Sequence, residues 1–284
     1  MPRKPKIAIV GAGSLANSLA PALRHSGYTI TEVISREAPR SRQSARNLAT
    51  KVGAQAVTAP TATLEATLLW LCVPDRQIRA VAASLAGRAH GNVRFAFHSS
   101  GALTSRELAR LRKDEIAIAS VHPLMTFVPG ARPSLAGVPF ALEGDSPATR
   151  LAKAIVRDLE GKSFVLPAKR KAAYHAWATM TSPLLLAFLV TLEDAARAAG
   201  LTRDDSRRKS LPIIRQTLAN YSRLGPGHSF SGPIIRGDVE TVARHLAVLR
   251  RHPEARAVYL ALARSAMRTL PVNNRKELGK LLQG

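Results

Sequence analysis

The chain has 284 residues, of which 46% are hydrophobic, and its 42 Lys and Arg against 19 Asp and Glu give a formal charge of +23. This length allows two domains with a well-buried core. The single cysteine, Cys72, excludes a disulfide framework and a cysteine-cluster metal site, and it suits a reducing cytoplasm.

The positive charge has several physical explanations: nucleic-acid binding, a phosphorylated cofactor, an acidic substrate or a basic solvated surface. Lys and Arg are spread over many segments, and aromatic residues make up only 5% of the chain, so no stacking platform for single strands is present. We therefore expect a solvated basic surface and no nucleic-acid partner.

The apolar runs are too short for membrane or export functions. The longest, residues 176–192, falls short of the roughly 20 residues that cross a bilayer, and it contains Pro183. The run after the basic start breaks at Gly11, which is too short for a signal peptide. We expect a cytoplasmic protein in which residues 176–192 form a buried core or interface helix.

The first motif is a glycine turn between a strand and a helix. Residues 7–10 are apolar and β-prone, residues 11–16 fit the pattern G-x-G-x-x-G/A, and helical periodicity follows. Gly11 allows the tight turn, Gly13 lets the backbone approach a pyrophosphate, and Ala16 allows close packing of helix on strand. The start of this helix therefore predicts a dinucleotide site, although such a turn also closes ordinary strand–helix units.

The end of the second predicted strand, 28–35, bears on which dinucleotide is bound. NAD sites usually place Asp or Glu there for the ribose 2′-hydroxyl, but this chain has Ser35-Arg36, with Arg40 and Arg42 close behind. A hydroxyl and a guanidinium suit a 2′-phosphate, which favours NADP (NADPH) over NAD. Glu37 weakens this argument. The alternative is that these arginines are simply the exposed start of the next helix.

Strands and helices alternate as far as residue 166, and only helical periodicity follows. We predict an α/β fold, a Rossmann-type doubly wound sheet in residues 1–166, followed by an all-helical C-terminal domain in residues 167–284 that serves substrate binding and dimerisation. The further predicted strands are 54–57, 66–73, 92–97, 116–121, 138–144 and 163–166.

Ligands of such sheets lie beyond the carboxyl ends of the strands. The turn Val73-Pro74-Asp75 should therefore line the cofactor cleft near the nicotinamide ribose, although Asp75 is equally suited to cap the following helix. The predicted cofactor-binding residues are Gly11, Gly13, Ser14, Leu15, Ser35, Arg36, Val73, Pro74 and Asp75.

Two histidines follow successive predicted strands. His98, with Ser99 and Ser100 after it, ends strand 92–97, and His122 ends strand 116–121, so both should face the cleft. Histidine can act as a general acid near neutral pH, and Ser100 can bind a substrate carboxylate or carbonyl. The alternative is that a serine caps a helix and each histidine binds a neighbouring carbonyl. We expect no metal site, because the two histidines lack spaced partners.

The helical half adds three candidates for the substrate site. Lys171 and His175 are one turn apart on a long predicted helix, 168–200, which should be buried all round and kinked at Pro183. Arg236 lies in the Gly- and Pro-rich stretch 225–238, which we expect to form a loop, and it can meet an anionic ligand or pair with Asp238.

Several motifs together carry a resemblance to a known family. The segments 98–103 (HSSGAL), 121–127 (VHPLMTF), Tyr174-His175 and 231–238 (SGPIIRGD) resemble a bacterial family of Rossmann-like oxidoreductases with a helical C-terminal domain of unknown function. That family is related to pyrroline-5-carboxylate reductase and the hydroxyacid dehydrogenases. The resemblance implies an NAD(P)-binding fold and a homodimer formed through the helical domain, with no assigned reaction.

The chain departs from the wider group at one place. Dehydrogenases of that group often carry Lys and Asn one turn apart on the first helix of the second domain, whereas this chain has Lys171 and His175, and Ser182-Pro183 where relatives commonly show Ser-Asn. An acid role would therefore fall to His175, His122 or Lys171. We expect an NADP-dependent oxidoreductase that reduces a small polar or anionic carbonyl or imine; the alternative is an NADP-binding sensor or scaffold without turnover.

Overall fold

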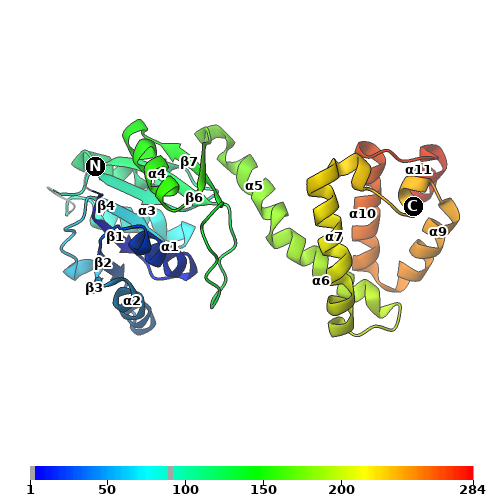
Figure 1. Ribbon diagram of the computed structural model, residues 1–284, viewed down its shortest axis with the longest axis horizontal. Helices are drawn as coiled ribbons and strands as arrows, with labels where there is room; N and C mark the ends of the chain where they lie inside the picture. The colour runs from blue at the N-terminus through cyan, green and yellow to red at the C-terminus, as the bar shows by residue number, and fades with distance from the viewer. Residues whose placement is uncertain (1–3, 89–91, 284) are drawn as a thin grey trace. The chain divides into compact units, whose positions relative to one another are not determined.

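The computed structural model (Figure 1) describes residues 4–88 and 92–283, which divide into two compact units. The first unit runs to Thr179 and holds the sheet, and the second runs from Met180 and is helical. The sheet ends near the predicted boundary at residue 166, but the first helix after it, α5 (Lys171–Thr181), still lies largely in the first unit.

The first unit is built on one eight-stranded sheet in the order β3-β2-β1-β4-β5-β6-β7-β8. All neighbouring pairs are parallel except β6 and β7, which are antiparallel. This confirms the Rossmann-type sheet. Its strands are β1 (Ile7–Val10), β2 (Ile30–Ser35), β3 (Gln55–Thr58), β4 (Leu68–Leu71), β5 (Phe95–His98), β6 (Ala117–Pro123), β7 (Pro139–Gly144) and β8 (Lys162–Val165).

Helices cover both faces of this sheet. One face packs against α1 (Ser14–His25), α2 (Pro39–Val52) and α4 (Ser146–Asp158), and the other against α3 (Asp75–Leu85) and the 3₁₀ segment η2 (Ser105–Asp114). The central strands β1 and β4 are apolar and buried at every position, as expected for strands covered on both faces. Short 3₁₀ turns lie at η1 (Ala59–Thr61) and η3 (Ala168–Arg170).

The predicted long helix 168–200 differs from the structure in continuity and in burial. It is divided into α5 and α6 (Pro183–Arg197) at Ser182, whose φ of −125° and ψ of −71° are not helical. The break precedes Pro183, because proline cannot donate the backbone hydrogen bond that would continue the helix. The expectation that this helix is buried all round is wrong for the single chain: Met180 is 67% and Leu186 63% exposed.

The second unit continues with helices that bury a small core of its own. They are α7 (Arg203–Ser229), α8 (Pro233–Arg236), α9 (Val239–Val248), η4 (Leu249–Arg251), α10 (Pro253–Thr269) and α11 (Arg275–Gln283). The stretch predicted as a loop, 225–238, is helical in part. Gly225, with φ 73°, interrupts α7, one further helical turn follows, and α8 is a separate short helix.

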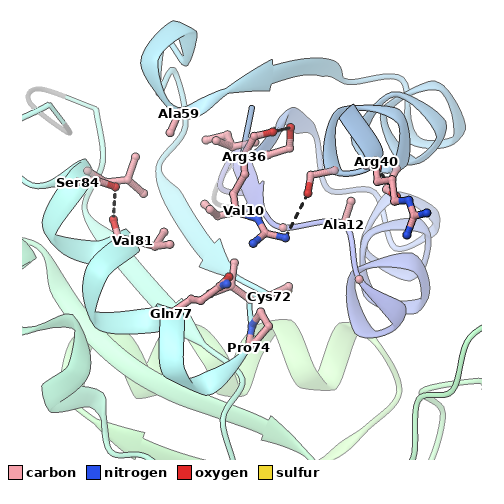
Figure 2. Close-up of a pocket in the computed structure, with 18 residues that line it drawn as sticks. Val10, Ala12, Arg36, Arg40, Ala59, Cys72, Pro74, Gln77, Val81 and Ser84 are labelled. Carbon is pink, nitrogen blue, oxygen red and sulfur yellow. Dashed lines mark hydrogen bonds between the residues drawn. The ribbon is translucent and has the colours of Figure 1, made fainter. Parts of the chain in front are cut away.

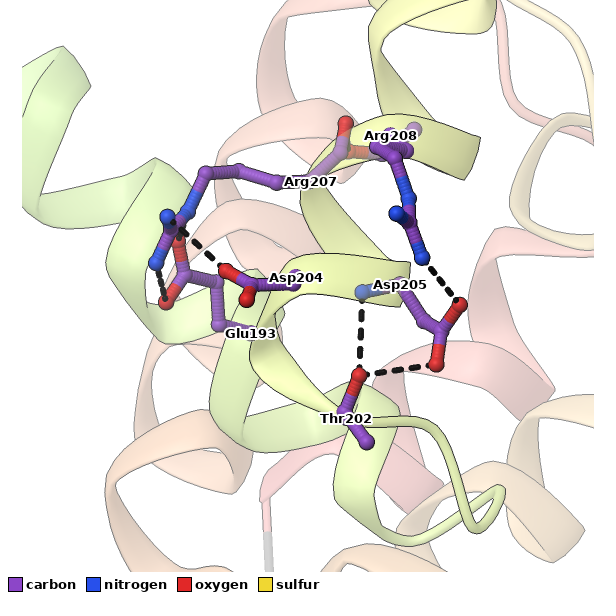
Figure 3. Close-up of polar contacts among 7 residues, drawn as sticks. Glu193, Thr202, Asp204, Asp205, Arg207 and Arg208 are labelled. Carbon is purple, nitrogen blue, oxygen red and sulfur yellow. Dashed lines mark hydrogen bonds and ion pairs between the residues drawn. The ribbon is translucent and has the colours of Figure 1, made fainter.

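Polar contacts tie the start of α7 to α6 (Figure 3). Thr202 caps α7 by accepting a hydrogen bond from the backbone N–H of Asp205 at 3.1 Å. The Arg207 guanidinium donates to the Glu193 carboxylate of α6, with 2.6 Å between Nε and Oε1, and to Asp204 at 3.2 Å. These contacts hold α6 and α7 side by side.

One helical stretch, Ala168–Arg197, is long and apolar enough by length and composition to cross a membrane. Its first turns nevertheless pack on the sheet, where Lys171 and Tyr174 are buried. The expectation that residues 176–192 form an interface helix stays a prediction.

Candidate functional site

The glycine turn between β1 and α1 leaves room for an anion. Gly11 has φ +99°, and a Cβ there would lie 2.6 Å from the carbonyl oxygen of Cys72, so only glycine fits. A Cβ on Gly13 would meet no atom within 4 Å, which is the open space that a phosphate would occupy. No described side chain caps α1, whose first turn also lacks acidic residues, so its N-terminal N–H groups can face an anion.

A cleft of about 440 Å³ opens at the carboxyl ends of β1, β2 and β4 (Figure 2). Hydroxyl and guanidinium groups from β2 and α2 form one wall, and the Arg36 guanidinium reaches across to the Ser41 hydroxyl at 3.3 Å. The residues that line the cleft include Gly11, Gly13, Ser35, Arg36, Arg40, Ser41, Ser44, Cys72, Val73, Pro74 and Gln77. A dinucleotide with an extra phosphate fits this combination of a glycine cradle and clustered arginine and serine side chains.

Six of the predicted cofactor residues line this cleft, and three do not. Ser14 and Leu15 form the first turn of α1 next to it, where their backbone rather than their side chains would face an anion. Asp75 is the first residue of α3 rather than its N-cap, and its carboxylate accepts a hydrogen bond from the Ser100 hydroxyl at 2.7 Å. The structure thus uses Asp75 to tie the turn after β4 to the turn after β5.

The turn after β5 is held by several hydrogen bonds. The Ser100 hydroxyl also accepts from the backbone N–H of Leu103 at 2.9 Å, and the Ser99 hydroxyl accepts from the Trp70 indole at 2.9 Å. Both serines have structural roles here, but neither is the helix cap considered as the alternative from the sequence, because the N-cap residue of η2 is Thr104. Ser100 has no hydroxyl hydrogen left for a substrate while it donates to Asp75.

His98 is fully buried and both of its ring nitrogens are engaged. Nδ1 accepts from the Ser100 backbone N–H at 3.1 Å, and Nε2 donates to the Thr104 carbonyl at 3.0 Å. Burial lowers its pKa from 6.5 to about 4. His98 is therefore neutral at pH 7 and holds backbone rather than substrate, which matches the structural alternative considered from the sequence.

His122 and His175 come together over Gly101. A Cβ on Gly101 would lie 2.8 Å from Nε2 of His122 and 2.7 Å from Cδ2 of His175, so this glycine admits the two rings. Nδ1 of His122 is 2.8 Å from the Tyr174 hydroxyl. Burial, with the nearby charge of Lys171, lowers the pKa of His122 to about 4. Both histidines are partly exposed, so a substrate can reach them.

Lys171 is 1% exposed and lies beneath this group. Its Nζ donates to the Ser100 carbonyl at 2.8 Å and to the Ser120 hydroxyl. Burial lowers its pKa to about 8, while the charges of Glu143 and Asp75 act in the opposite direction. Lys171 is thus an internal support of the turn after β5.

Arg236 belongs to the helical unit, where it ends α8 and is exposed. Its neighbours in the segment 231–238 have structural roles. Gly237, at φ +70°, ends α8, and Asp238 caps α9 by accepting from the Thr241 backbone N–H at 3.1 Å. The alternative of an Arg236–Asp238 pair is not seen as an ion pair in the described ranges, where Asp238 instead binds Thr241. Arg236 stays a predicted ligand contact.

The sequence argument did not identify Gly101, Ser120 or Tyr174 as site residues. Gly101 and Ser120 stand beside the predicted His98-Ser99-Ser100 and Val121-His122 segments, and Tyr174 lies one helical turn after Lys171. A helical projection of residues 171–175 places Tyr174 and Lys171 on one face, which is the signal that would have found it. No three His, Cys, Asp or Glu side chains form a metal-binding group in residues 4–88 and 92–283.

We predict opposite outcomes for alanine at the two glycines of the turn. Gly11→Ala lowers the free energy of unfolding by about 1 to 3 kcal/mol, because it adds a Cβ at positive φ against the Cys72 carbonyl. Gly13→Ala leaves stability near the wild-type value but weakens NADPH binding at least about tenfold, because its methyl group takes phosphate space. Thermal unfolding and fluorescence titration measure these effects; a Gly13→Ala variant that binds normally contradicts the predicted position of the phosphate.

The buried His98 makes the free energy of unfolding depend on pH. Its pKa lies below the ordinary 6.5 in the folded state, so protonation favours unfolding, and the stabilisation present above pH 6.5 is lost as the pH falls toward 4. The full shift corresponds to about 3 kcal/mol. Urea unfolding at pH 7 and pH 4.5 measures how much the free energy of unfolding changes with pH. This change should be smaller in His98→Asn than in the wild type, and the same as in the wild type in His25→Asn, where an exposed histidine is replaced as the control. Equal pH dependence in all three proteins contradicts this assignment.

Two domain families match parts of the chain. Residues 6–93 match a family described as NADP oxidoreductase, coenzyme F420-dependent, and residues 138–266 match a domain of unknown function, DUF2520. A search of the curated proteins found no match.

Solved structures match nearly the whole chain. A protein from Bacteroides fragilis named as a candidate NADP oxidoreductase is 24% identical, with TM-score 0.73, over 92% of this chain and 97% of its own. A pyrroline-5-carboxylate reductase from Coxiella burnetii is 15% identical, with TM-score 0.60, over 93% and 98%. An imine reductase from Myxococcus stipitatus in complex with NADP+ is 17% identical, with TM-score 0.62, over 93% and 94%. Residues 6–93 are therefore similar to the NADP oxidoreductase family and residues 138–266 to the DUF2520 domain, in line with the resemblance that the motifs carry.

Proposed function

We propose that the protein is an NADPH-dependent reductase of a small polar or anionic carbonyl or imine. The observation that carries the proposal is the position of two partly exposed histidines over Gly101, at the edge of the sheet where the glycine cradle opens. The fold shared with reductases, and the family match of residues 6–93, support the reaction class.

The cleft supplies the contacts for the cofactor. The start of α1 and Gly13 would hold the pyrophosphate, and Arg36, with Ser41 and Arg40, would hold the 2′-phosphate. Val73 and Pro74 line the end of the cleft at the turn after β4, which Asp75 ties to the turn carrying Gly101. When bound, NADPH supplies a hydride.

The histidines then have different roles. His122, with its lowered pKa, is neutral at pH 7 and acts on the substrate through a hydrogen bond. His175 lies beside it, with 6.4 Å between ring centroids, and is the proposed proton donor. Lys171 contributes a buried positive charge that favours an anionic or electron-rich substrate.

The cofactor half of the proposal rests on Arg36. Arg36→Ala should weaken NADPH binding about tenfold to a hundredfold and leave NADH binding unchanged, because a charge-assisted bond to the 2′-phosphate is lost. Arg46→Ala, which removes an exposed arginine from the following helix α2 outside the cleft lining, is the matched control. Fluorescence titration measures both affinities, and tighter binding of NADH by the wild type contradicts the preference for NADP.

The reaction is tested by NADPH oxidation across a panel of small keto acids, aldehydes, ketones and cyclic imines. Turnover that falls in His175→Asn while NADPH binding is retained supports the reductase. NADPH binding without oxidation of any compound, unchanged by His122 and His175 substitutions, indicates the alternative, an NADP-binding sensor or scaffold.

We also propose that the protein is a cytoplasmic homodimer. The neighbouring helices α6 and α7 expose many large apolar side chains, more than a monomer usually leaves in water. These are Leu184, Leu185, Leu186, Val190, Leu211, Ile213, Leu218, Tyr221 and Leu224. A second copy of the chain would cover this surface with the same two helices, as in a two-fold symmetric interface. The single cysteine suits the cytoplasm.

Charged substitutions should break this dimer. Leu186→Glu and Ile213→Glu place a carboxylate in the interface and should give monomers at micromolar concentration, whereas Val248→Glu, at an exposed apolar residue of α9, should leave the dimer intact. Sedimentation velocity measures the mass. A wild-type protein that sediments as a monomer excludes this interface.

A further inference from the structure

The hydroxyl of Tyr174 is fixed beside His122 by packing on several sides. Tyr174 is 7% exposed, and its ring contacts the rings of Phe164 and Trp177, with centroids 6.0 and 5.9 Å away. Lys171, one turn earlier on α5, anchors that helix through its bond to the Ser100 carbonyl. The 2.8 Å contact between the Tyr174 hydroxyl and Nδ1 of His122 is therefore a built feature of the fold.

This contact decides which nitrogen of His122 carries hydrogen. A neutral imidazole has one N–H donor and one nitrogen lone pair, and its lone pair is a strong acceptor. A phenol hydroxyl donates more readily than it accepts, so Tyr174 donates to Nδ1 and the hydrogen of the ring resides on Nε2. The lowered pKa of His122 keeps the ring in this neutral form at pH 7.

The Nε2 edge of His122 is directed at the open side of the turn. It lies over Gly101, where a Cβ would approach it to 2.8 Å, and the described ranges contain no hydrogen-bond partner for it. A substrate that comes to rest against Gly101 would therefore meet an N–H group. The charges nearest to that group are Lys171 and the neighbouring histidines when protonated, all of them positive.

We propose that Tyr174 is the positioning residue that holds His122 in its Nε2–H form, and that the site accepts substrates through a hydrogen-bond acceptor, a carbonyl oxygen or the lone pair of a neutral imine. A preformed iminium ion offers no lone pair and brings positive charge next to Lys171, so it is disfavoured. The substrate class rests on the proposed reductase function, whereas the tautomer does not.

The N–H of His122 would assist carbonyl reduction directly. As hydride reaches the carbonyl carbon, the π electron pair moves to the oxygen, and the His122 N–H stabilises the negative charge that develops there. A proton from His175 or water then completes the alcohol. A neutral histidine in this position polarises the substrate without having to give up its own proton.

The chain contains a matched control pair. Nδ1 of His245 is 3.1 Å from the Tyr259 hydroxyl, and the two rings meet at 85° with centroids 5.9 Å apart, close to the 85° and 5.6 Å of His122 and Tyr174. Tyr259 lies in the helical unit, on α10, and has no part in the proposed site. Tyr174→Phe and Tyr259→Phe each delete one hydroxyl from the same kind of pair.

Nitrogen-15 NMR of the histidine rings tests the tautomer in the whole protein, with His122→Asn used to assign the signals. We expect hydrogen on Nε2 of His122 in the wild type and in Tyr259→Phe, and a mixture of the two tautomers in Tyr174→Phe. Hydrogen on Nδ1 in the wild type overturns the proposal, and so does a tautomer that is unchanged in Tyr174→Phe. This measurement does not depend on turnover, so it separates failure here from failure of the reductase function.

Kinetics test the substrate class on whichever ketone of the panel is turned over. Tyr174→Phe should lower kcat about tenfold with little change in KM and in NADPH affinity, and Tyr259→Phe should change none of these. The wild type should reduce the ketone or a neutral cyclic imine at least about tenfold faster than an N-methyl iminium salt of similar size. Faster reduction of the iminium salt overturns the proposed substrate preference.

Discussion

The carbonyl of Ser100 is the point on which the candidate site depends. It accepts hydrogen bonds from Nζ of Lys171 at 2.8 Å and from the Ser120 hydroxyl at 3.0 Å. These bonds fix the turn after β5 to the next strand and to α5. Gly101 follows directly, so the position of the backbone under His122 and His175 is set by Lys171 and Ser120. Removal of the Lys171 or the Ser120 side chain would therefore displace the backbone at Gly101, although neither side chain faces a substrate itself.

Burial of the Lys171 ammonium group costs free energy of desolvation, and the nearby carboxylates of Glu143 and Asp75 lower this cost. Taking an ammonium group out of water disfavours its charged form, and the reduced pKa of Lys171 expresses that cost. The negative charges of Glu143 and Asp75 act against the reduction. Each of these carboxylates is itself bound, Glu143 by the backbone N–H and hydroxyl of Ser105 and Asp75 by Ser100. The turn after β5 is thus held by a connected set of charged and polar groups rather than by apolar packing.

The sequence predicted the sheet and the cofactor turn because their signals are local. The apolar strand 7–10, the glycine spacing at 11 and 13 and the helix after it are one continuous segment, and the structure has them in that order. The partnership of Tyr174 and His122 spans 52 positions and depends on how α5 meets β6, which no local pattern specifies. The prediction that residues 168–200 are buried all round is wrong because burial also depends on tertiary contacts. Hydrophobicity predicts that a surface is covered, and it does not say whether the cover comes from the same chain.

The segment 231–238 shows how a specific motif can be mostly structural. Gly232 and Gly237 adopt positive φ angles, Pro233 begins α8, and Asp238 caps α9. A Cβ on Gly237 would lie 2.6 Å from Asn274, whose side chain donates back to the Gly237 carbonyl. The Ile235 carbonyl also accepts a hydrogen bond from the Asn273 N–H. Five of the eight residues, Gly232, Pro233, Ile235, Gly237 and Asp238, therefore have a role in the local chain geometry. In this segment only Arg236 is a charged, exposed side chain without such a role, so its guanidinium is the group of the motif that is free to meet a ligand.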